Sequence, residues 1–315
     1  MMTMPTTTNK RLERLGLSVS RIGFGSAPIG DLYGIVPEET ALETIRTALD
    51  GGVTLFDTAP GYSLGLCESR LGLALSGVPR ERFVLESKVG RIMTERGLHF
   101  DLTRDGLERS LDQSLTRLGV THLDIVLLHD PDDLEPEACE TALPTLLGWR
   151  ERGLVRAVGV GMNQWQMPLR FLEHFDLDVV MVAGRYTLLE QGGLVLLDAC
   201  QFRDVAVFAA GVFNTGILAS GAKTGAKFNY TDAPTDVLVR VARLEAICAR
   251  HGVSLAAAAI QFVLAHTAVK SAVLGASHPD EVRANLESSR MSISPEFWGE
   301  LSACELLPEH VPTPT

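Results

Sequence analysis

The feature that most constrains the fold of this chain is an alternation of strand-like and helix-like segments that continues for almost its whole length. Short apolar runs typical of buried strands occupy residues 21–25, 53–57, 83–88, 122–129, 155–161, 179–183, 205–210 and 271–274. Amphipathic patterns typical of helices occupy residues 37–49, 67–75, 102–118, 135–151, 166–174, 193–202, 236–251 and 254–266, with a last helix from about residue 279. Eight strand–helix units in 315 residues predict a closed α/β barrel of the (β/α)8 type rather than an open sheet.

No change in composition marks a linker, so a single domain is expected over residues 1–315. Ahead of the barrel, residues 11–20 alternate around Gly16 and predict a short N-terminal β-hairpin. The hydrophobic content of 46% is sufficient for a large buried core.

The charge of the chain favours a small-molecule partner. Its 28 basic and 39 acidic residues give a net charge of −11, which argues against binding to nucleic acid or to an anionic membrane. Residues 1–10 lack the apolar centre of a signal peptide, and the longest apolar run, 255–265, is interrupted by Gln261 and too short to span a bilayer. We therefore expect a cytoplasmic protein. Its oligomeric state is left open, because no pattern indicates an interface.

The five cysteines are scattered, odd in number and without metal-type spacing, and we expect them to be reduced thiols. They are Cys67, Cys139, Cys200, Cys248 and Cys304. No metal site is predicted.

Residues 53–62 carry the most informative chemistry, because a strand that ends in an acid runs into a turn and then a tyrosine. Asp57 ends the second strand and Tyr62 lies on the loop beyond it, whereas Lys88 ends the third strand and His129 the fourth. In a parallel barrel these strand ends surround one cleft. A tyrosine has an ordinary pKa of about 10, and a neighbouring ammonium lowers that pKa by favouring the phenolate. The set therefore predicts proton transfer by Tyr62, with Lys88 as the cation that Asp57 holds in place. His129 could bind a substrate oxygen or relay its proton.

Taken singly, each of these residues also has a structural explanation. An aspartate at a strand end often caps a helix, a terminal lysine can simply reach solvent, and a histidine in an apolar strand can be a core residue. Together they favour a site, because four ionisable groups at the ends of three consecutive strands would otherwise need one another as partners.

Several segments in the same order resemble the aldo-keto reductase family. They are FDTAPGYSLGLCESRLGLAL at residues 56–75, the strand end Glu86-Ser87-Lys88, and LLHDPDD at residues 127–133. The similarity extends from Leu15 to about Asn285. The resemblance implies a TIM-barrel enzyme that moves a hydride between nicotinamide C4 and a carbonyl or alcohol carbon. It assigns a catalytic tetrad to Asp57, Tyr62, Lys88 and His129, in which Tyr62 is the general acid in reduction and the general base in oxidation.

The same resemblance implies where a nicotinamide cofactor would bind. Asn163 stands where family members hold the carboxamide, although Met162 replaces the usual preceding serine, and Ala183-Gly184 replaces a glutamine. After the seventh strand the family's Tyr-Ser-Pro-Leu is replaced by residues 210–216, so that an aromatic such as Phe213 would stand for the stacking tyrosine. This loop is expected to offer backbone N–H groups to the pyrophosphate, which assigns to the cofactor site Gly211, Phe213, Asn214 and Gly216.

The segment GASHPDEVRAN at residues 275–285 bears on the choice between NAD and NADP. The resemblance places Ser277, Glu281 and Asn285 at the cofactor, with Glu281 where NADPH-dependent relatives carry an arginine. A carboxylate there would repel a 2′-phosphate and accept hydrogen bonds from free ribose hydroxyls, which predicts NAD. NADP stays possible because Arg283 lies close by. The alternative is that Asp280 and Glu281 only complement the dipole of the last helix.

Within the family the chain is most similar to the aldose 1-dehydrogenases, which include L-fucose, D-threo-aldose and L-galactose dehydrogenases, together with pyridoxal 4-dehydrogenase. The similar segments are GSAPIGDLYG at residues 25–34, GVFNTGIL at 211–218 and KFNY at 227–230. This implies oxidation of a sugar hemiacetal to a lactone. Alternatives are oxidation of pyridoxal, NADPH-dependent reduction of aldehydes, and a low-turnover regulatory subunit that only binds cofactor. Candidate substrate contacts are Tyr33, Asp130, Asp132, Trp165, Asn229 and Tyr230.

Overall fold

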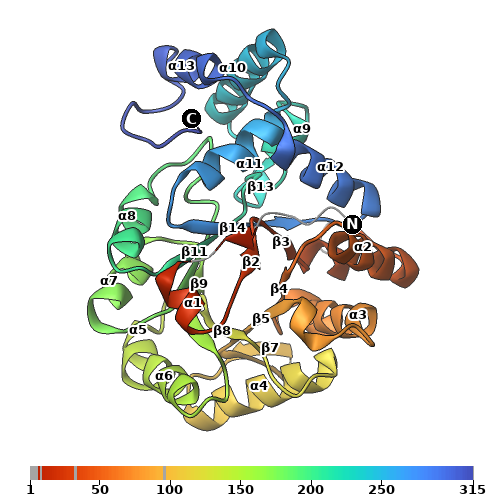
Figure 1. Cartoon of the computed structure of the whole chain (residues 1–315), viewed down its shortest axis with the longest axis vertical. Helices are drawn as coiled ribbons and strands as arrows, with labels where there is room; N and C mark the ends of the chain where they lie inside the picture. The colour runs from red at the N-terminus through yellow and green to blue at the C-terminus, as the bar shows by residue number, and fades with distance from the viewer. Residues whose placement is uncertain (1–5, 8, 32–33, 95–96, 315) are drawn as a thin grey trace.

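Eight parallel strands close into a barrel at the centre of the computed structural model, which describes residues 6–7, 9–31, 34–94 and 97–314 (Figure 1). In chain order the barrel strands are β3 (Ile22–Gly25), β4 (Leu55–Asp57), β5 (Val84–Val89), β8 (Ile125–His129), β9 (Ala157–Met162), β10 (Val179–Ala183), β11 (Ala206–Ala210) and β14 (Val269–Gly275). Each strand pairs with the next, and β14 closes the ring on β3 through the partners Ala272 and Ile22. The predicted (β/α)8 barrel is confirmed.

Helices surround the barrel on its outside (Figure 1). The main ones are α2 (Glu38–Asp50), α3 (Leu66–Leu75), α4 (Arg104–Leu118), α6 (Leu143–Glu151), α7 (Gln166–His174), α8 (Leu194–Phe202), α10 (Thr235–His251), α11 (Leu255–Ala265), α12 (Pro279–Arg290) and α13 (Pro295–Ala303). Local sequence fixes the ends of α4, since the Thr103 hydroxyl accepts a hydrogen bond from Gly106 N at 3.1 Å and Gly119 adopts a left-handed φ of 65°. The helix expected over residues 135–151 is divided into α5 (Glu135–Glu137), a π-helical turn η4 (Ala138–Ala142) and α6. The terminal helix α13 was not predicted.

Short helical segments occupy several of the loops. They are the 3₁₀ turns η1 (Ala27–Gly30), η2 (Tyr62–Gly65) and η3 (Arg80–Arg82), and the helix α9 (Ile217–Ser220). The first two follow β3 and β4 at the carboxyl end of the barrel, so they help to shape its mouth.

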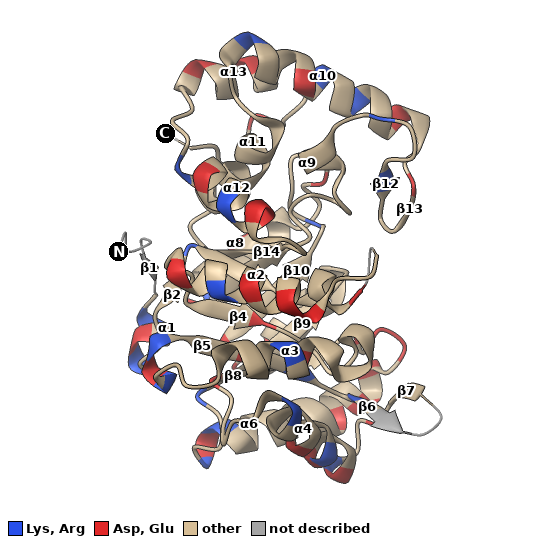
Figure 2. Ribbon diagram, turned by 90° about the vertical axis from the view of Figure 1, so that its right-hand side faces the viewer, with Lys and Arg blue, Asp and Glu red and all other residues tan. Residues whose placement is uncertain are grey.

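Side chains on the barrel strands alternate between an inner and an outer core. The inner core packs apolar residues from facing strands, including Leu55, Ile125, Leu127, Met181, Phe208 and Val273. Their chain neighbours, such as Phe56, Val126 and Val207, belong to the larger core under the helices. Figure 2 shows that most charged residues lie on the helices and loops around the barrel. The barrel is therefore filled, and chemistry can take place only at its ends.

The N-terminal segment closes the amino end of the barrel. β1 (Thr6–Thr7) pairs antiparallel with β2 (Val19–Ser20), and α1 (Lys10–Arg14) lies between them, across the centre of the barrel in Figure 1. Leu12 and Leu17 are buried in the inner core. A two-stranded sheet is thus present near the N-terminus, but the hairpin predicted over residues 11–20 was wrong, because one of its strands lies at Thr6–Thr7. Asn9 accepts a hydrogen bond from Leu12 N at 2.9 Å and starts a helix where a strand was expected.

Two small hairpins, neither of them predicted, extend from the loops between barrel strands. One pairs β6 (Arg91–Thr94) with β7 (Gly97–Phe100), and the other pairs β12 (Lys227–Phe228) with β13 (Thr231–Asp232). Their strands are too short to show a period of their own in the sequence. Residues of both segments reach the carboxyl end of the barrel.

Within the described residues, no single helix has both the length and the apolar composition needed to cross a membrane. Only α10 and α11 taken together meet those two conditions, and they are bent by 98° relative to each other. All five cysteines are free thiols, as predicted.

Candidate active site

A hollow of about 340 Å³ opens at the carboxyl end of the barrel and brings the four predicted catalytic residues together. One side of it carries the ionisable residues Asp57, Tyr62, Lys88 and His129. The opposite side carries strand ends without large side chains, namely Gly25, Gly161, Ala183, Ala210 and Gly275. This asymmetry leaves room for a flat group beside a cluster of proton-transfer residues.

Lys88 is a fixed cation at the bottom of this hollow. Its side chain is 2% exposed, and Nζ forms an ion pair with Asp57 Oδ1 and donates a hydrogen bond to Thr58 O at 2.9 Å. Burial lowers the pKa of Lys88, but Asp57 and the other neighbouring groups outweigh it and raise that pKa above its ordinary value. Lys88 therefore stays protonated, with Nζ 5.0 Å from the centre of the Tyr62 ring.

Burial raises the pKa of Tyr62 well above its ordinary value, although the charge of Lys88 lowers it. The predicted lowering by the ammonium is thus present, but the expectation that it would dominate was wrong, because desolvation of the phenolate is the larger effect. Near neutral pH Tyr62 is therefore a phenol and a proton donor.

His129 faces Tyr62 edge-on, with 6.0 Å between the ring centres and 87° between the ring planes. Burial, and then the charges of Lys88 and Arg91, hold the pKa of His129 well below its ordinary value, so the ring is neutral. In the described part of the chain its buried Nδ1 has no hydrogen-bond partner. Because His129 lines the hollow, its neutral imidazole can form a hydrogen bond with an oxygen of a molecule bound there.

Asp130 connects His129 to the loop that follows the neighbouring strand β9. Its carboxylate accepts hydrogen bonds from Asn163 N at 2.9 Å and Asn163 Nδ2 at 3.0 Å, and from Arg91 at 3.2 Å. Its Oδ2 is also 3.6 Å from His129 Nε2. Arg185 holds the same asparagine by donating to Asn163 O at 2.7 Å. Asn163 is therefore placed at the mouth by two side chains from neighbouring loops.

A second hollow, of about 520 Å³, continues from the first. Both are lined by Pro28, Gly211, Val273 and Gly275. Beyond these shared residues, the second hollow is lined by five of the predicted cofactor residues, Phe213, Gly216, Ser277, Glu281 and Asn285. The carboxylate of Glu281 accepts hydrogen bonds from Ser277 N at 2.7 Å and Ser277 Oγ at 3.2 Å. The two hollows together form one trough that leads from Tyr62 to α12.

Asn214, which was also predicted to bind the cofactor, lines neither hollow. It is 2% exposed, and it accepts a hydrogen bond from Thr187 Oγ1 at 2.6 Å and donates one to Gly184 O at 3.4 Å. Its side chain thus holds the loop after β11 against the loop after β10. We assign it this structural role in place of a cofactor contact.

The predicted substrate residues divide into two groups. Asp130 and Tyr230 line the first hollow. Trp165 packs on the outer core, Asp132 accepts a hydrogen bond from Gln164 at 2.9 Å, and Asn229 accepts one from Arg185 at 3.4 Å. None of these three lines the hollow. Tyr33 lies outside the described residues.

Sequence reasoning missed two charged residues at the site. Arg91 lines the first hollow, pairs with Asp130 and stacks on Phe100 at 4.9 Å. Glu86 is fully buried beside Lys88. Strand alternation could have indicated Glu86, because residues two apart on a strand share a face.

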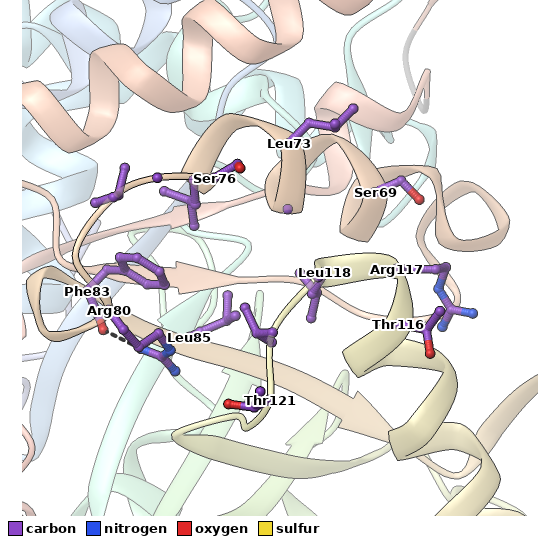
Figure 3. A pocket seen from close by; sticks show the side chains of 16 residues that line it. Ser69, Leu73, Ser76, Arg80, Phe83, Leu85, Thr116, Arg117, Leu118 and Thr121 are labelled. Atoms are coloured by element: carbon purple, nitrogen blue, oxygen red, sulfur yellow. Dashed lines mark hydrogen bonds between the residues drawn. The ribbon is translucent and has the colours of Figure 1, made fainter.

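A larger hollow, of about 720 Å³, lies away from the mouth between α3 and α4 (Figure 3). Its two charged residues are already paired, Arg80 with Asp124 and Arg117 with Glu68. Neither of these two charged side chains is therefore free to take part in catalysis.

Comparison with known proteins gives matches over nearly the whole chain. The model of the Aldo/keto reductase family matches residues 21–306. D-threo-aldose 1-dehydrogenase from a Pseudomonas species is 36% identical, with 96% of this chain and 99% of the relative aligned. Pyridoxal 4-dehydrogenase from Microbacterium luteolum is 37% identical, with 95% and 98% aligned. The holo form of an aldo-keto reductase from Bacillus halodurans superposes with a TM-score of 0.80 at 23% identity, covering 98% of each chain.

Proposed function

We propose that this chain, which belongs to the aldo/keto reductase family, oxidises C1 of an aldose. The reaction would be an NAD(P)-dependent oxidoreduction. The substrate would be the cyclic hemiacetal of a sugar such as L-fucose, L-galactose or another D-threo-aldose, and the product its lactone. The observation that carries this proposal is that Tyr62 contacts both the fixed cation Lys88 and the neutral His129 in the first hollow.

The trough fits an extended dinucleotide. Its first part has a wall of glycine and alanine strand ends that leaves space for a flat ring, with the amide of Asn163 at the mouth. Its second part continues past Gly211 and Gly216 to Ser277, Glu281 and Asn285. A nicotinamide bound there would supply the hydride acceptor. Asn163 would hold its carboxamide, and the loop after β11 would face its phosphates.

Glu281 supports a preference for NAD over NADP. Its carboxylate lies on the second part of the trough, fixed by two hydrogen bonds from Ser277. A negative charge at that place repels a phosphate dianion and can accept hydrogen bonds from ribose hydroxyls. Arg283 is engaged with Asp280 at 2.6 Å, which reduces its availability to a phosphate.

In the proposed oxidation, Tyr62 acts as the general base. Its phenolate would take the proton of the anomeric hydroxyl as the C1–H bond breaks and the C1=O bond of the lactone forms, and a bound nicotinamide would supply the acceptor for the hydride. Lys88 stabilises the phenolate by its charge, and His129 donates a hydrogen bond to the reacting oxygen. Asp57 keeps Lys88 charged and in place.

The sugar would lie in the outer part of the first hollow. Asp130 and Arg91 offer charged hydrogen-bonding groups there, and Tyr230 offers an aromatic ring at the rim. Such a lining suits a polyhydroxylated ring. The 36% identity to a D-threo-aldose 1-dehydrogenase supports the same class of substrate. Pyridoxal is the second candidate, because a relative named for its oxidation is 37% identical.

The test is reduction of NAD⁺ and NADP⁺ by purified protein at mildly alkaline pH, with L-fucose, L-galactose, D-arabinose, glucose and pyridoxal as substrates. We expect turnover of one or two sugars with NAD⁺, and a loss of at least about 100-fold in Tyr62→Phe. Turnover of pyridoxal alone would favour the second candidate. If none of these substrates is oxidised and the protein instead reduces aldehydes with NADPH, both the aldose and the pyridoxal proposals would be overturned.

A further inference from the structure

Beneath the catalytic residues lies one more ionisable group, Glu86, which the tetrad does not account for. It precedes Lys88 by two residues on β5, so both side chains point to the barrel interior. Its residue exposure is 0%, and among the described residues neither of its carboxyl oxygens has a partner with normal hydrogen-bond geometry. Burying a carboxyl group without a hydrogen-bond partner costs free energy, and the cost is larger if the group is ionised.

The surroundings of Glu86 hold one positive charge for two carboxyl groups. Asp57 is its direct neighbour on β4, and Lys88 Nζ is 3.9 Å from Glu86 Oε1. Lys88 already forms an ion pair with Asp57 and donates to Thr58 O. On the other side, the strand partner of Glu86 on β8 is the apolar Ile125. Two carboxylates would therefore compete for one ammonium in the buried interior of the barrel.

We propose that Glu86 is a positioning residue, a neutral carboxylic acid whose O–H donates to the Asp57 carboxylate and thereby holds the Asp57–Lys88 pair beneath Tyr62. This inference rests on the proposed function, because its consequence is felt in proton transfer by Tyr62. Burial, and then the charge of Asp57, raise the pKa of Glu86 well above its ordinary value, while Lys88 opposes them less strongly.

A neutral Glu86 has two effects on Tyr62. First, a neutral Glu86 adds no second negative charge below the phenolate. A second negative charge there would raise the pKa of Tyr62 further. Second, a neutral Glu86 shares the charge of Asp57 through a hydrogen bond, so that Asp57 cancels less of the field of Lys88. Both effects favour the phenolate that oxidation requires.

The test compares two substitutions of similar size. Glu86→Gln keeps an uncharged hydrogen-bond donor at this position. On the acid side of the pH profile, kcat for oxidation falls as Tyr62 becomes protonated, and this acid limb should lie at the same pH in Glu86→Gln as in the native enzyme. Glu86→Met removes the donor, and its acid limb should move to higher pH by about one unit, with unchanged thermal stability or a small loss. An ionised Glu86 would give the opposite result, because Glu86→Gln would then move the limb to lower pH. An unshifted limb in Glu86→Met would also overturn the proposal.

An infrared difference spectrum of the protein without cofactor provides a second readout. Native minus Glu86→Gln should show the C=O stretching band of a protonated carboxylic acid at neutral pH, and absence of that band would overturn the proposal. Glu68→Gln is the matched control, since Glu68 is equally buried but is bound by Arg117 at 2.6 Å and Ser87 at 2.7 Å. The Glu68→Gln substitution should leave the C=O stretching band of the protonated carboxylic acid in place. If no sugar is oxidised, the proposed function fails, whereas this spectrum and an ultraviolet titration of Tyr62 in the same variants still decide the role of Glu86.

Discussion

Asp130 binds Asn163 twice, accepting one hydrogen bond from the backbone N–H at 2.9 Å and one from the side-chain amide at 3.0 Å. The bond from the backbone N–H fixes the position of the loop after β9. The bond from the side chain fixes the direction of the Asn163 amide. An amide held in this way is prepared to meet a planar carboxamide without losing rotamer freedom on binding.

The first prediction concerns this pair. Asp130→Ala should weaken binding of NAD⁺ by about 5-fold, since the Asn163 amide loses about 1 kcal/mol of preorganising hydrogen bonds. Fluorescence titration with the dinucleotide measures it. Asp132→Ala is the control, because Asp132 is exposed and accepts a hydrogen bond from Gln164 rather than from Asn163. Equal affinities in the two variants would remove Asp130 from the cofactor site.

Much of this architecture could be predicted from sequence, because strand alternation and strand ends are local signals. Asp57 and His129 end their strands and Lys88 is the last but one residue of the strand between them, and parallel pairing alone brings these ends together. The net pKa of Tyr62 could not be predicted, because it depends on how completely the loop buries the phenol. Arg91 was missed for a similar reason, since a short hairpin and not a barrel strand brings it to the mouth.

The second prediction separates the charge of Lys88 from its place in the fold. Lys88→Met should lower kcat by about 100-fold or more and also destabilise the protein by about 3–5 kcal/mol, because Asp57 is left buried without its cation. Adding Asp57→Asn should restore most of the stability but none of the activity. Chemical unfolding and steady-state rates measure both quantities. Recovery of activity in the double variant would contradict the role of Lys88.

The third prediction is the sign of the pH dependence. Burial raises the pKa of Tyr62, so the phenolate needed for oxidation is scarce near neutrality and becomes more abundant as the pH rises. Oxidation should therefore accelerate through the alkaline range, while reduction, which needs the phenol, should be flat near neutrality and decline only at high pH. His129 contributes no limb near neutrality, since its pKa is lowered and it is already neutral there. An oxidation rate that falls with increasing pH would exclude Tyr62 as the base.

The fourth prediction tests whether Glu281 selects the cofactor. Glu281→Gln keeps an oxygen that can accept the hydrogen bonds of Ser277 but removes the negative charge. The ratio of kcat/KM for NADP⁺ to kcat/KM for NAD⁺ should therefore rise about 5- to 10-fold. This change corresponds to about 1 kcal/mol of repulsion between the carboxylate and the 2′-phosphate. Asp280→Asn is the matched control, because Asp280 lies in the same first turn of α12 but contacts Arg283 and lines neither part of the trough. If the two acids only complement the helix dipole, both variants should lose a little stability and leave the ratio unchanged. A rise in Glu281→Gln alone would assign the discrimination to the carboxylate at Glu281, since the two variants remove the same charge from the same turn.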